Sequence, residues 1–155
     1  MKSHKHKLCM VSSSGGHWEQ LNTLKQQLLK NYNGFVVSEK TSFSAKSDYD
    51  YLMPMTDAKD VLCIFKLIYI VGWAFSIMIK DKPDVIISTG ALIGIPFLLI
   101  GKLFGKKTIF IETLSRVTDG TKTGKLAYKF VDLFIYQWKS LDKVYPKGVY
   151  GGCIY

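Results

Sequence analysis

The residues that most clearly could do chemistry are the run Ser-Ser-Ser-Gly-Gly-His at 12–17, which separates an apolar stretch from a helical pattern. Glycines let backbone N–H groups approach a ligand closely, and a helix N-terminus favours phosphate. The hydroxyls of Ser13 and Ser14 add donors, so with Gly15 and Gly16 they predict a phosphate-binding turn. The alternative is a tight strand-to-helix turn in which Ser14 only caps the helix.

His17 stands at the first turn of the helix that follows. The positive end of a helix disfavours a protonated imidazole, and neutral imidazole can accept a proton or a hydrogen bond. His17 is therefore a candidate to accept a proton or a hydrogen bond from a substrate, with a hydrogen bond to neighbouring backbone as the alternative. The turn has neither the G-x-G-x-x-G spacing of dinucleotide sites nor the P-loop motif, so no cofactor is expected.

Two later turns carry further candidates. Glu112 closes an otherwise apolar strand, and Arg116 follows it in the same turn. We expect Glu112 to bind substrate or move a proton, with a structural ion pair to Arg116 as the alternative. Thr89 and Gly90 follow another apolar strand and have the character of turn residues. Because ligands bind at the carboxyl ends of parallel strands, the three turns are predicted to line one crevice.

The elements that must position these residues alternate between apolar runs and helical patterns, which predicts a Rossmann-like parallel sheet with helices on both faces. Strands are expected at 7–12, 34–38, 51–55, 83–89, 106–113 and 132–136, with a short one near the end. Helices are expected at 17–30, 58–80, 92–104 and 124–130. No repeat or linker divides the chain, so residues 1–155 are predicted to form a single α/β domain.

Composition and charge restrict the classes of partner that the chain could bind. The chain carries a net charge of +9, and all of its 21 basic residues except Arg116 are lysines. Nucleic-acid binding relies on arginine for bidentate contacts, whereas a lysine excess suits an anionic membrane surface. No nucleic-acid partner is expected. The three cysteines are far apart and show no metal-binding or disulfide spacing, so no metal site is expected and a reducing compartment is.

The stretch "VLCIFKLIYIVGWAFSIMI", residues 61–79, contains one charge. It is apolar enough to span a bilayer, which takes about 20 residues. If it crossed, however, the strands on its two sides could not share a sheet, so we expect it to lie on or dip into the membrane. A stripe of Lys66, Tyr69, Trp73 and Lys80 suits the headgroup boundary and is predicted to contact it. The alternative is a core helix whose lysines face water.

Four ordered motifs resemble a known family: "SSSGGHWEQL", "PDVIISTGALIGIP", "FIETLSRV" and "LFIYQWKSLDKVYPKGVYGG". Together they are similar to bacterial capsule and exopolysaccharide glycosyltransferase accessory subunits. These are relatives of the membrane-anchor subunit of the eukaryotic dolichol-diphosphate-linked N-acetylglucosaminyltransferase. The resemblance runs through nearly the whole chain and extends to the N-terminal half of the peptidoglycan glycosyltransferase MurG, with its Gly-Gly-His loop after the first strand.

The resemblance implies one Rossmann-like half of a GT-B glycosyltransferase, corresponding to its N-terminal half. A separate donor-binding subunit would hold the nucleotide sugar, and this half would bind a lipid-diphosphate-linked saccharide acceptor. The resemblance implies that Gly15, Gly16 and His17 lie at the acceptor diphosphate and the reacting hydroxyl, and that Glu112 and Arg116 line the same cleft. We also expect Ser13, Ser14, Thr89 and Gly90 to help bind the acceptor or its diphosphate. His17 and Glu112 are the catalytic candidates, and either could be the base.

We therefore expect a subunit at the cytoplasmic face of the cell membrane that transfers a sugar, from a UDP-sugar, only with its partner, in capsule or exopolysaccharide synthesis. A chain of this length supplies one of two GT-B halves and is expected to be inactive alone. Eukaryotic anchor subunits usually begin with a membrane-spanning segment, whereas this chain begins with "MKSHKHK", so its membrane attachment is expected elsewhere. The alternative is a membrane scaffold that activates its partner without catalytic residues of its own.

Overall fold

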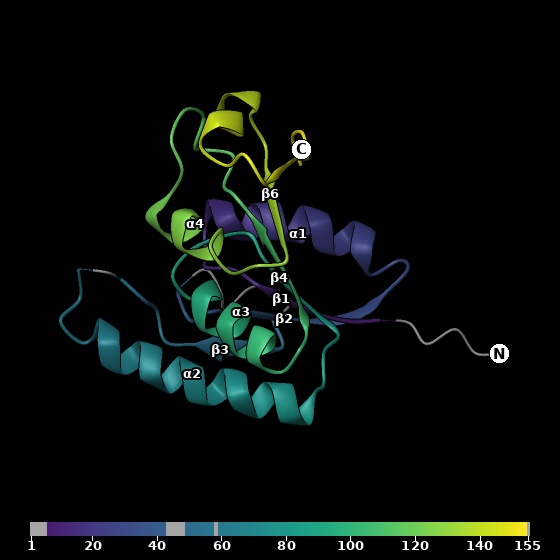
Figure 1. Ribbon diagram of the computed structural model, residues 1–155. Coiled ribbons are helices and arrows are strands. Elements are labelled where there is room, and N and C mark those ends of the chain that lie inside the picture. The colour runs from purple at the N-terminus through teal and green to yellow at the C-terminus, as the bar shows by residue number, and fades with distance from the viewer. Residues whose placement is uncertain (1–5, 43–48, 58, 155) are drawn as a thin grey trace.

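The computed structural model describes residues 6–42, 49–57 and 59–154 and shows a seven-stranded sheet (Figure 1). Every strand pair in the sheet is parallel, and the order is β3-β2-β1-β4-β5-β6-β7. The strands are β1 (Lys7–Val11), β2 (Asn33–Glu39), β3 (Tyr51–Met53), β4 (Val85–Ser88), β5 (Lys107–Ile111), β6 (Leu133–Tyr136) and β7 (Val149–Tyr150). The predicted Rossmann-like α/β fold is confirmed.

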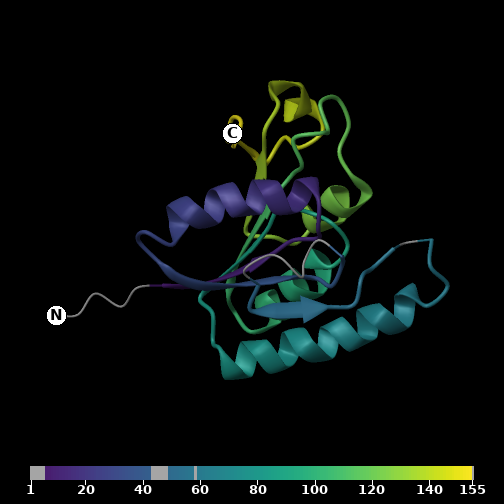
Figure 2. The ribbon, with the colours of Figure 1, turned by 180° about the vertical axis from the view of Figure 1, so that it is seen from behind.

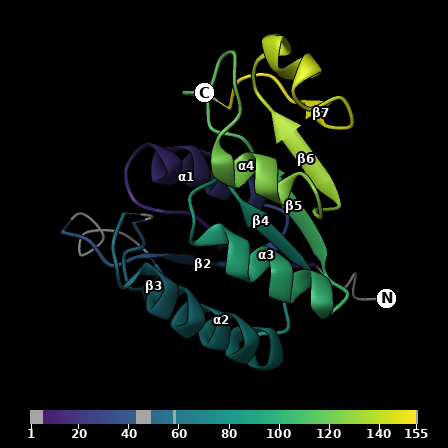
Figure 3. The ribbon, with the colours of Figure 1, turned by 60° about the vertical axis from the view of Figure 1, so that its left-hand side comes forward.

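Helices cover both faces of this sheet, as expected (Figures 1 and 3). Helix α1 (Gly16–Leu28) packs Leu21 against Met10 and Ile87 on one face. The other face carries α2 (Cys63–Lys80), α3 (Gly94–Leu103) and α4 (Lys122–Ala127). A short 3-10 helix, η2 (Lys139–Lys143), follows β6 and was not predicted.

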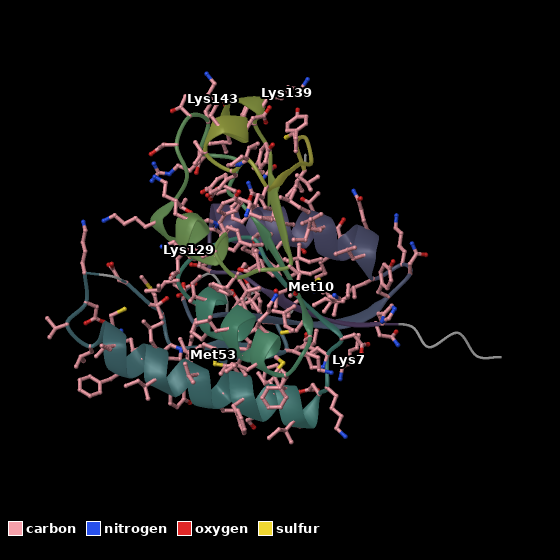
Figure 4. The ribbon with its side chains drawn as sticks, in the orientation of Figure 1. Lys7, Met10, Met53, Lys129, Lys139 and Lys143 are labelled. Carbon is pink, nitrogen blue, oxygen red and sulfur yellow. The ribbon has the colours of Figure 1, made fainter. Side chains whose placement is uncertain are left out.

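The centre of the sheet is the apolar core. Met10 aligns with Val36 on one side and with Ile87 on the other, and all three are buried. Figure 4 shows the contrast with the surface, where Lys139 and Lys143 extend from η2. Four- to seven-residue apolar runs buried on both faces are typical of parallel strands, which explains why the sequence pattern identified them.

The largest boundary difference is at α2, which begins at Cys63 and is predicted from residue 58, and smaller differences occur where the candidate residues lie. The strands predicted at 83–89 and 106–113 end at Ser88 and Ile111, so Thr89 and Glu112 belong to turns. Helix α1 begins at Gly16, and its N-cap is Gly15 at φ 75° with no side-chain cap. The expectation that Ser14 caps this helix is therefore wrong, because the left-handed turn through Gly15 leaves Ser14 outside the capping position.

Helix α2 differs from its neighbour α3 in exposure. Most of α3 is buried, whereas α2 buries one face through Ile70, Ala74 and Ile77. By length and composition α2 could cross a membrane. Only 28% of the helix is buried inside the protein, unlike a core helix. It runs along the sheet edge beside β3 and α3 (Figure 2). Since β1 and β4, on its two sides in sequence, pair directly, the prediction that these strands share one sheet is confirmed.

Candidate functional site

The strand order places β1 and β4 side by side at the centre, and the chain progresses outward from them in opposite directions. In open parallel sheets, ligands bind at this reversal, beyond the carboxyl ends of the strands. A cleft of about 570 Å³ opens there. Its lining residues are Gly16, His17, Gln20, Thr113, Leu114, Ser115 and Trp138. The first and third predicted turns therefore line one cleft, as expected.

The turn that contains Thr89 and Gly90 is connected to the cleft by hydrogen bonds between Thr89 and His17. The Nδ1 atom of His17 lies 2.8 Å from the backbone oxygen of Thr89, and the Thr89 hydroxyl donates to the backbone oxygen of His17 at 2.9 Å. A carbonyl can only accept, so Nδ1 carries the proton and Nε2 of the neutral ring is left as an acceptor. Thr89 thus orients the imidazole and selects its tautomer.

Gly90 completes this arrangement by leaving room for the ring. Its φ of 118° is a conformation that L side chains rarely adopt, and a Cβ atom there would lie 2.7 Å from the Nδ1 atom of His17. Neither Thr89 nor Gly90 lines the cleft. Both residues contact or make room for His17, and their role in binding an acceptor stays a prediction.

The turn between β1 and α1 presents backbone to the cleft edge. Gly15 and Gly16 are exposed, Ser13 and Ser14 are half-buried, and no side chain caps the first turn of α1. Exposed, uncapped N–H groups at a helix N-terminus favour a bound anion. Of these four residues, Gly16 lines the cleft directly.

Glu112 lies on the opposite side of the sheet edge and does not line the cleft. Its carboxylate is 1% exposed and accepts hydrogen bonds from four groups. The donors are the backbone N–H of Thr113 (3.0 Å), the N–H and hydroxyl of Thr121 (3.0 and 2.9 Å) and the hydroxyl of Tyr145 (2.6 Å). We call Glu112, Thr121 and Tyr145 the carboxylate network. It joins the end of β5 to the start of α4 and to the segment after η2.

The network is buried and closely packed. Burial, together with the hydrogen bond to Glu112, raises the pKa of Tyr145 well above its ordinary value, so this residue stays a neutral donor. At Gly124 a Cβ atom would collide with the Glu112 carboxylate, and at Gly120 with the Tyr145 hydroxyl. Such a carboxylate organises the fold, and it has no free lone-pair direction toward the cleft.

Arg116 is on the surface of the turn after β5. Its guanidinium donates to the carboxylate of Asp119 at 3.2 Å, and both side chains are largely exposed. The alternative of an ion pair between Glu112 and Arg116 is therefore wrong. The buried network supplies Glu112 with neutral donors, which leaves Arg116 to pair with a neighbour in its own turn.

Sequence reasoning missed several residues of the cleft. Trp138 follows β6 directly and donates from Nε1 to the backbone oxygen of Leu114 at 2.7 Å. The hydroxyls of Thr113 and Ser115 lie 3.1 Å apart, and Gln20 lines the cleft from α1. The position of Trp138 just beyond the end of a strand was an available signal, whereas Gln20 resembled any polar residue of a helix.

The predicted membrane stripe forms one flank of α2. Lys66 pairs with Asp60 at 2.5 Å, while Trp73 and Lys80 lie near the ring of Tyr51 at the β3 edge. Beside this flank is a face of exposed apolar side chains, formed by Val61 just before the helix and by Ile64, Phe65, Ile68, Val71, Phe75 and Ile79 within it. The lysines and Trp73 therefore border a larger apolar surface that the stripe alone did not reveal.

The part of the chain that the structure describes contains no cluster of metal-binding side chains. No group of three or more His, Cys, Asp or Glu side chains there could hold a metal ion. Cys9 and Cys63 are buried and Cys153 is exposed, and all three are free thiols.

The fold and cleft define a class of protein: a Rossmann-like α/β domain of the GT-B type. MurG of Acinetobacter baumannii superposes with a TM-score of 0.69 at 15% identity, covering 86% of this chain and 41% of MurG. A UDP-N-acetylglucosamine 2-epimerase from Rickettsia bellii superposes with a TM-score of 0.73 at 12% identity, covering 90% and 41%. The chain thus spans about two-fifths of these proteins, and at such identities the likeness shows the fold.

Sequence similarity shows the family to which the chain belongs. Residues 8–154 match the family described as "Oligosaccharide biosynthesis protein Alg14 like", and the chain belongs to that family. The UDP-N-acetylglucosamine transferase subunit ALG14 of Rattus norvegicus is 28% identical over 177 residues, covering 95% of this chain and 82% of the relative. The Homo sapiens subunit of the same name is 27% identical with the same coverage.

Proposed function

We propose that this chain is a non-autonomous subunit of a glycosyltransferase that transfers a sugar from a UDP-sugar to a lipid-diphosphate-linked saccharide acceptor. Its family and the relatives named as UDP-N-acetylglucosamine transferase subunits support a glycosyltransferase role. The observation that carries the proposal is the cleft, where an oriented imidazole stands beside the uncapped N-terminus of α1. The resemblance to capsule and exopolysaccharide glycosyltransferase subunits supports a role in capsule or exopolysaccharide synthesis.

In the proposed reaction, Nε2 of His17 accepts the proton of the acceptor hydroxyl as its oxygen attacks the anomeric carbon of the donor. The bond between that carbon and the nucleoside diphosphate breaks, and the diphosphate leaves with the electron pair. The fixed tautomer of His17 makes Nε2 the accepting atom. Backbone and hydroxyl donors of 13–16 hold the acceptor diphosphate, and Arg116 adds positive charge at the rim.

Between the two proposed catalytic residues, the geometry favours His17 as the base. Glu112 would have to release several internal donors before it could take a proton from a substrate in the cleft. We assign Glu112 a positioning role, because its network anchors the turn that contributes Thr113 and Ser115 to the cleft.

The donor site is proposed to lie on a separate partner subunit. The relatives are named as subunits, which supports a heteromer, and residues 1–155 are proposed to form one domain of it. The test is to purify the chain with and without a donor-binding partner and to measure transfer from UDP-sugars to a lipid-diphosphate acceptor. Transfer is expected only with the partner, and robust transfer by this chain alone would contradict the proposal.

Helix α2 is proposed to hold the subunit at the cytoplasmic face of the membrane. Its exposed apolar face, flanked by Lys66, Trp73 and Lys80, suits an interfacial helix. Substitution Ile68→Gln is expected to weaken binding to vesicles containing anionic lipid by about 5- to 30-fold. Leu126→Gln, on the exposed side of α4, removes a similar side chain elsewhere and should leave binding unchanged. Equal binding by both variants would exclude this face.

A scaffold without catalytic residues is the second candidate. It is favoured by Glu112, whose carboxylate is engaged in structural contacts. If His17→Ala retains full transfer in the complex, the chain acts as a scaffold, and the catalytic base must come from the partner.

A further inference from the structure

One buried polar atom at the cleft has no hydrogen-bond partner among the residues that the structure describes. In the described part of the chain, the buried side-chain atoms without a hydrogen-bond partner are Oε1 of Gln20 and Oγ of Ser12. Of these two residues, Gln20 lines the cleft, although its side chain is only 3% exposed. Buried acceptors in native proteins nearly always receive a hydrogen bond, so we expect this oxygen to accept one from a donor outside the chain.

The position of Gln20 relates it to the reacting atoms. It lies three residues after His17 on α1, which places both side chains on the same face of the helix one turn apart. A molecule whose hydroxyl reaches the imidazole therefore has neighbouring groups within reach of the Gln20 amide. An amide oxygen accepts only, so the matching group must be an N–H or an O–H.

Trp138 forms another wall of the same cleft. Its indole N–H is engaged by the backbone oxygen of Leu114 at 2.7 Å, so the ring is held in place while 39% of the residue stays exposed. A fixed aromatic face beside hydroxyls of Thr113 and Ser115 is a surface with one apolar side and polar edges. A pyranose ring has the same division, with C–H groups on its faces and hydroxyls around its edge.

We propose that Gln20 determines acceptor specificity: its amide oxygen accepts a hydrogen bond from one ring substituent of a sugar that packs on Trp138. This inference rests on the proposed function and deepens it, because it assigns a residue to sugar recognition in the same cleft. A site built to bond one polar group discriminates strongly against analogues that lack it, since the buried partner is then left unpaired.

The test crosses protein variants with acceptor analogues. The complex with the donor-binding partner is assayed on phytanyl diphosphate carrying glucose or N-acetylglucosamine, and on forms in which one ring hydroxyl or the acetamido group is replaced by hydrogen. For the wild type, loss of the group that Gln20 bonds is expected to lower kcat/KM by about 5- to 30-fold. For Gln20→Leu, the parent acceptor and that analogue are expected to react equally, because either change removes the same bond.

Stability provides a readout that separates recognition from folding. Replacing an unpartnered buried amide by an apolar side chain of similar size is expected to leave Tm unchanged or to raise it. Gln20→Ala serves as a second variant if leucine does not fit. Gln26→Leu, on the exposed side of α1, is the matched control and should discriminate between acceptors as the wild type does.

The outcomes distinguish this inference from the function on which it rests. If the wild-type complex transfers sugar to none of the acceptors, the proposed function fails and the inference fails with it. If the wild type transfers and Gln20→Leu loses the same factor on every acceptor, or loses nothing, only the role of Gln20 is overturned.

Discussion

His17 and Glu112 stand just beyond β1 and β5, on either side of β4, and have opposite surroundings. His17 faces the cleft, and its ring has one hydrogen bond to the described residues, at Nδ1, which leaves Nε2 available. Glu112 faces α4, where four donors surround its carboxylate. The comparison teaches that two titratable residues at one sheet edge need not share a site, because α1, which carries His17, and α4, which Glu112 faces, cover opposite faces of the sheet.

The largest effect is expected from His17→Ala. Loss of a general base should lower kcat of the partnered enzyme by about 10²- to 10⁴-fold with little change in stability, since His17 is only half-buried. Steady-state transfer assays and thermal unfolding measure the two quantities. His6→Ala, a histidine outside the cleft, is the control and should keep full activity. Full activity of the His17→Ala complex would contradict a catalytic role for His17.

Glu112→Ala should mainly affect folding. The change leaves buried donors of Thr121 and Tyr145 without an acceptor, so the free energy of unfolding should fall by about 3–5 kcal/mol. Chemical denaturation measures this loss, and Glu19→Ala, in the exposed first turn of α1, should stay within about 1 kcal/mol of the wild type. Normal stability with abolished transfer would show instead that Glu112 is a catalytic group.

Gly90→Ala tests whether the second turn positions the imidazole. The new Cβ atom would meet the ring of His17 in a backbone conformation that alanine disfavours. We expect a loss of about 1–3 kcal/mol in unfolding free energy, with a fall in kcat larger than any change in KM. Gly72→Ala, in open space on α2, is the matched glycine control and should be neutral or stabilising. Equal behaviour of the two variants would contradict a positioning role for Gly90.

Tyr145→Phe gives the smallest effect and sharpens the contrast. It removes one of the donors to Glu112 and keeps the buried ring, so we expect a loss of about 1–2 kcal/mol by denaturation. Transfer by the folded complex should change little, because Tyr145 does not line the cleft. A fall in kcat as large as that of His17→Ala would mean that the two regions act as one.

Much of this architecture could be predicted from local pattern. Apolar runs such as Lys7–Val11 and Lys107–Ile111 alternate with helical segments, and that alternation specifies parallel strands joined by helices. Parallel connection places every strand-to-helix turn at one edge, so the meeting of the turns at 12–17 and 112–116 followed from the chain order. The sequence also marked α2 as unusually apolar.

Three-dimensional packing decided the rest. The partner of His17 is Thr89, 72 residues away, and the donors to Glu112 come from Thr121 and Tyr145, 9 and 33 residues away. Such contacts depend on which face each helix covers, and local periodicity carries no information about that choice. A strand end shows that a polar residue lies at the edge of the sheet, but only the packed helices determine whether it meets a cleft or a buried network.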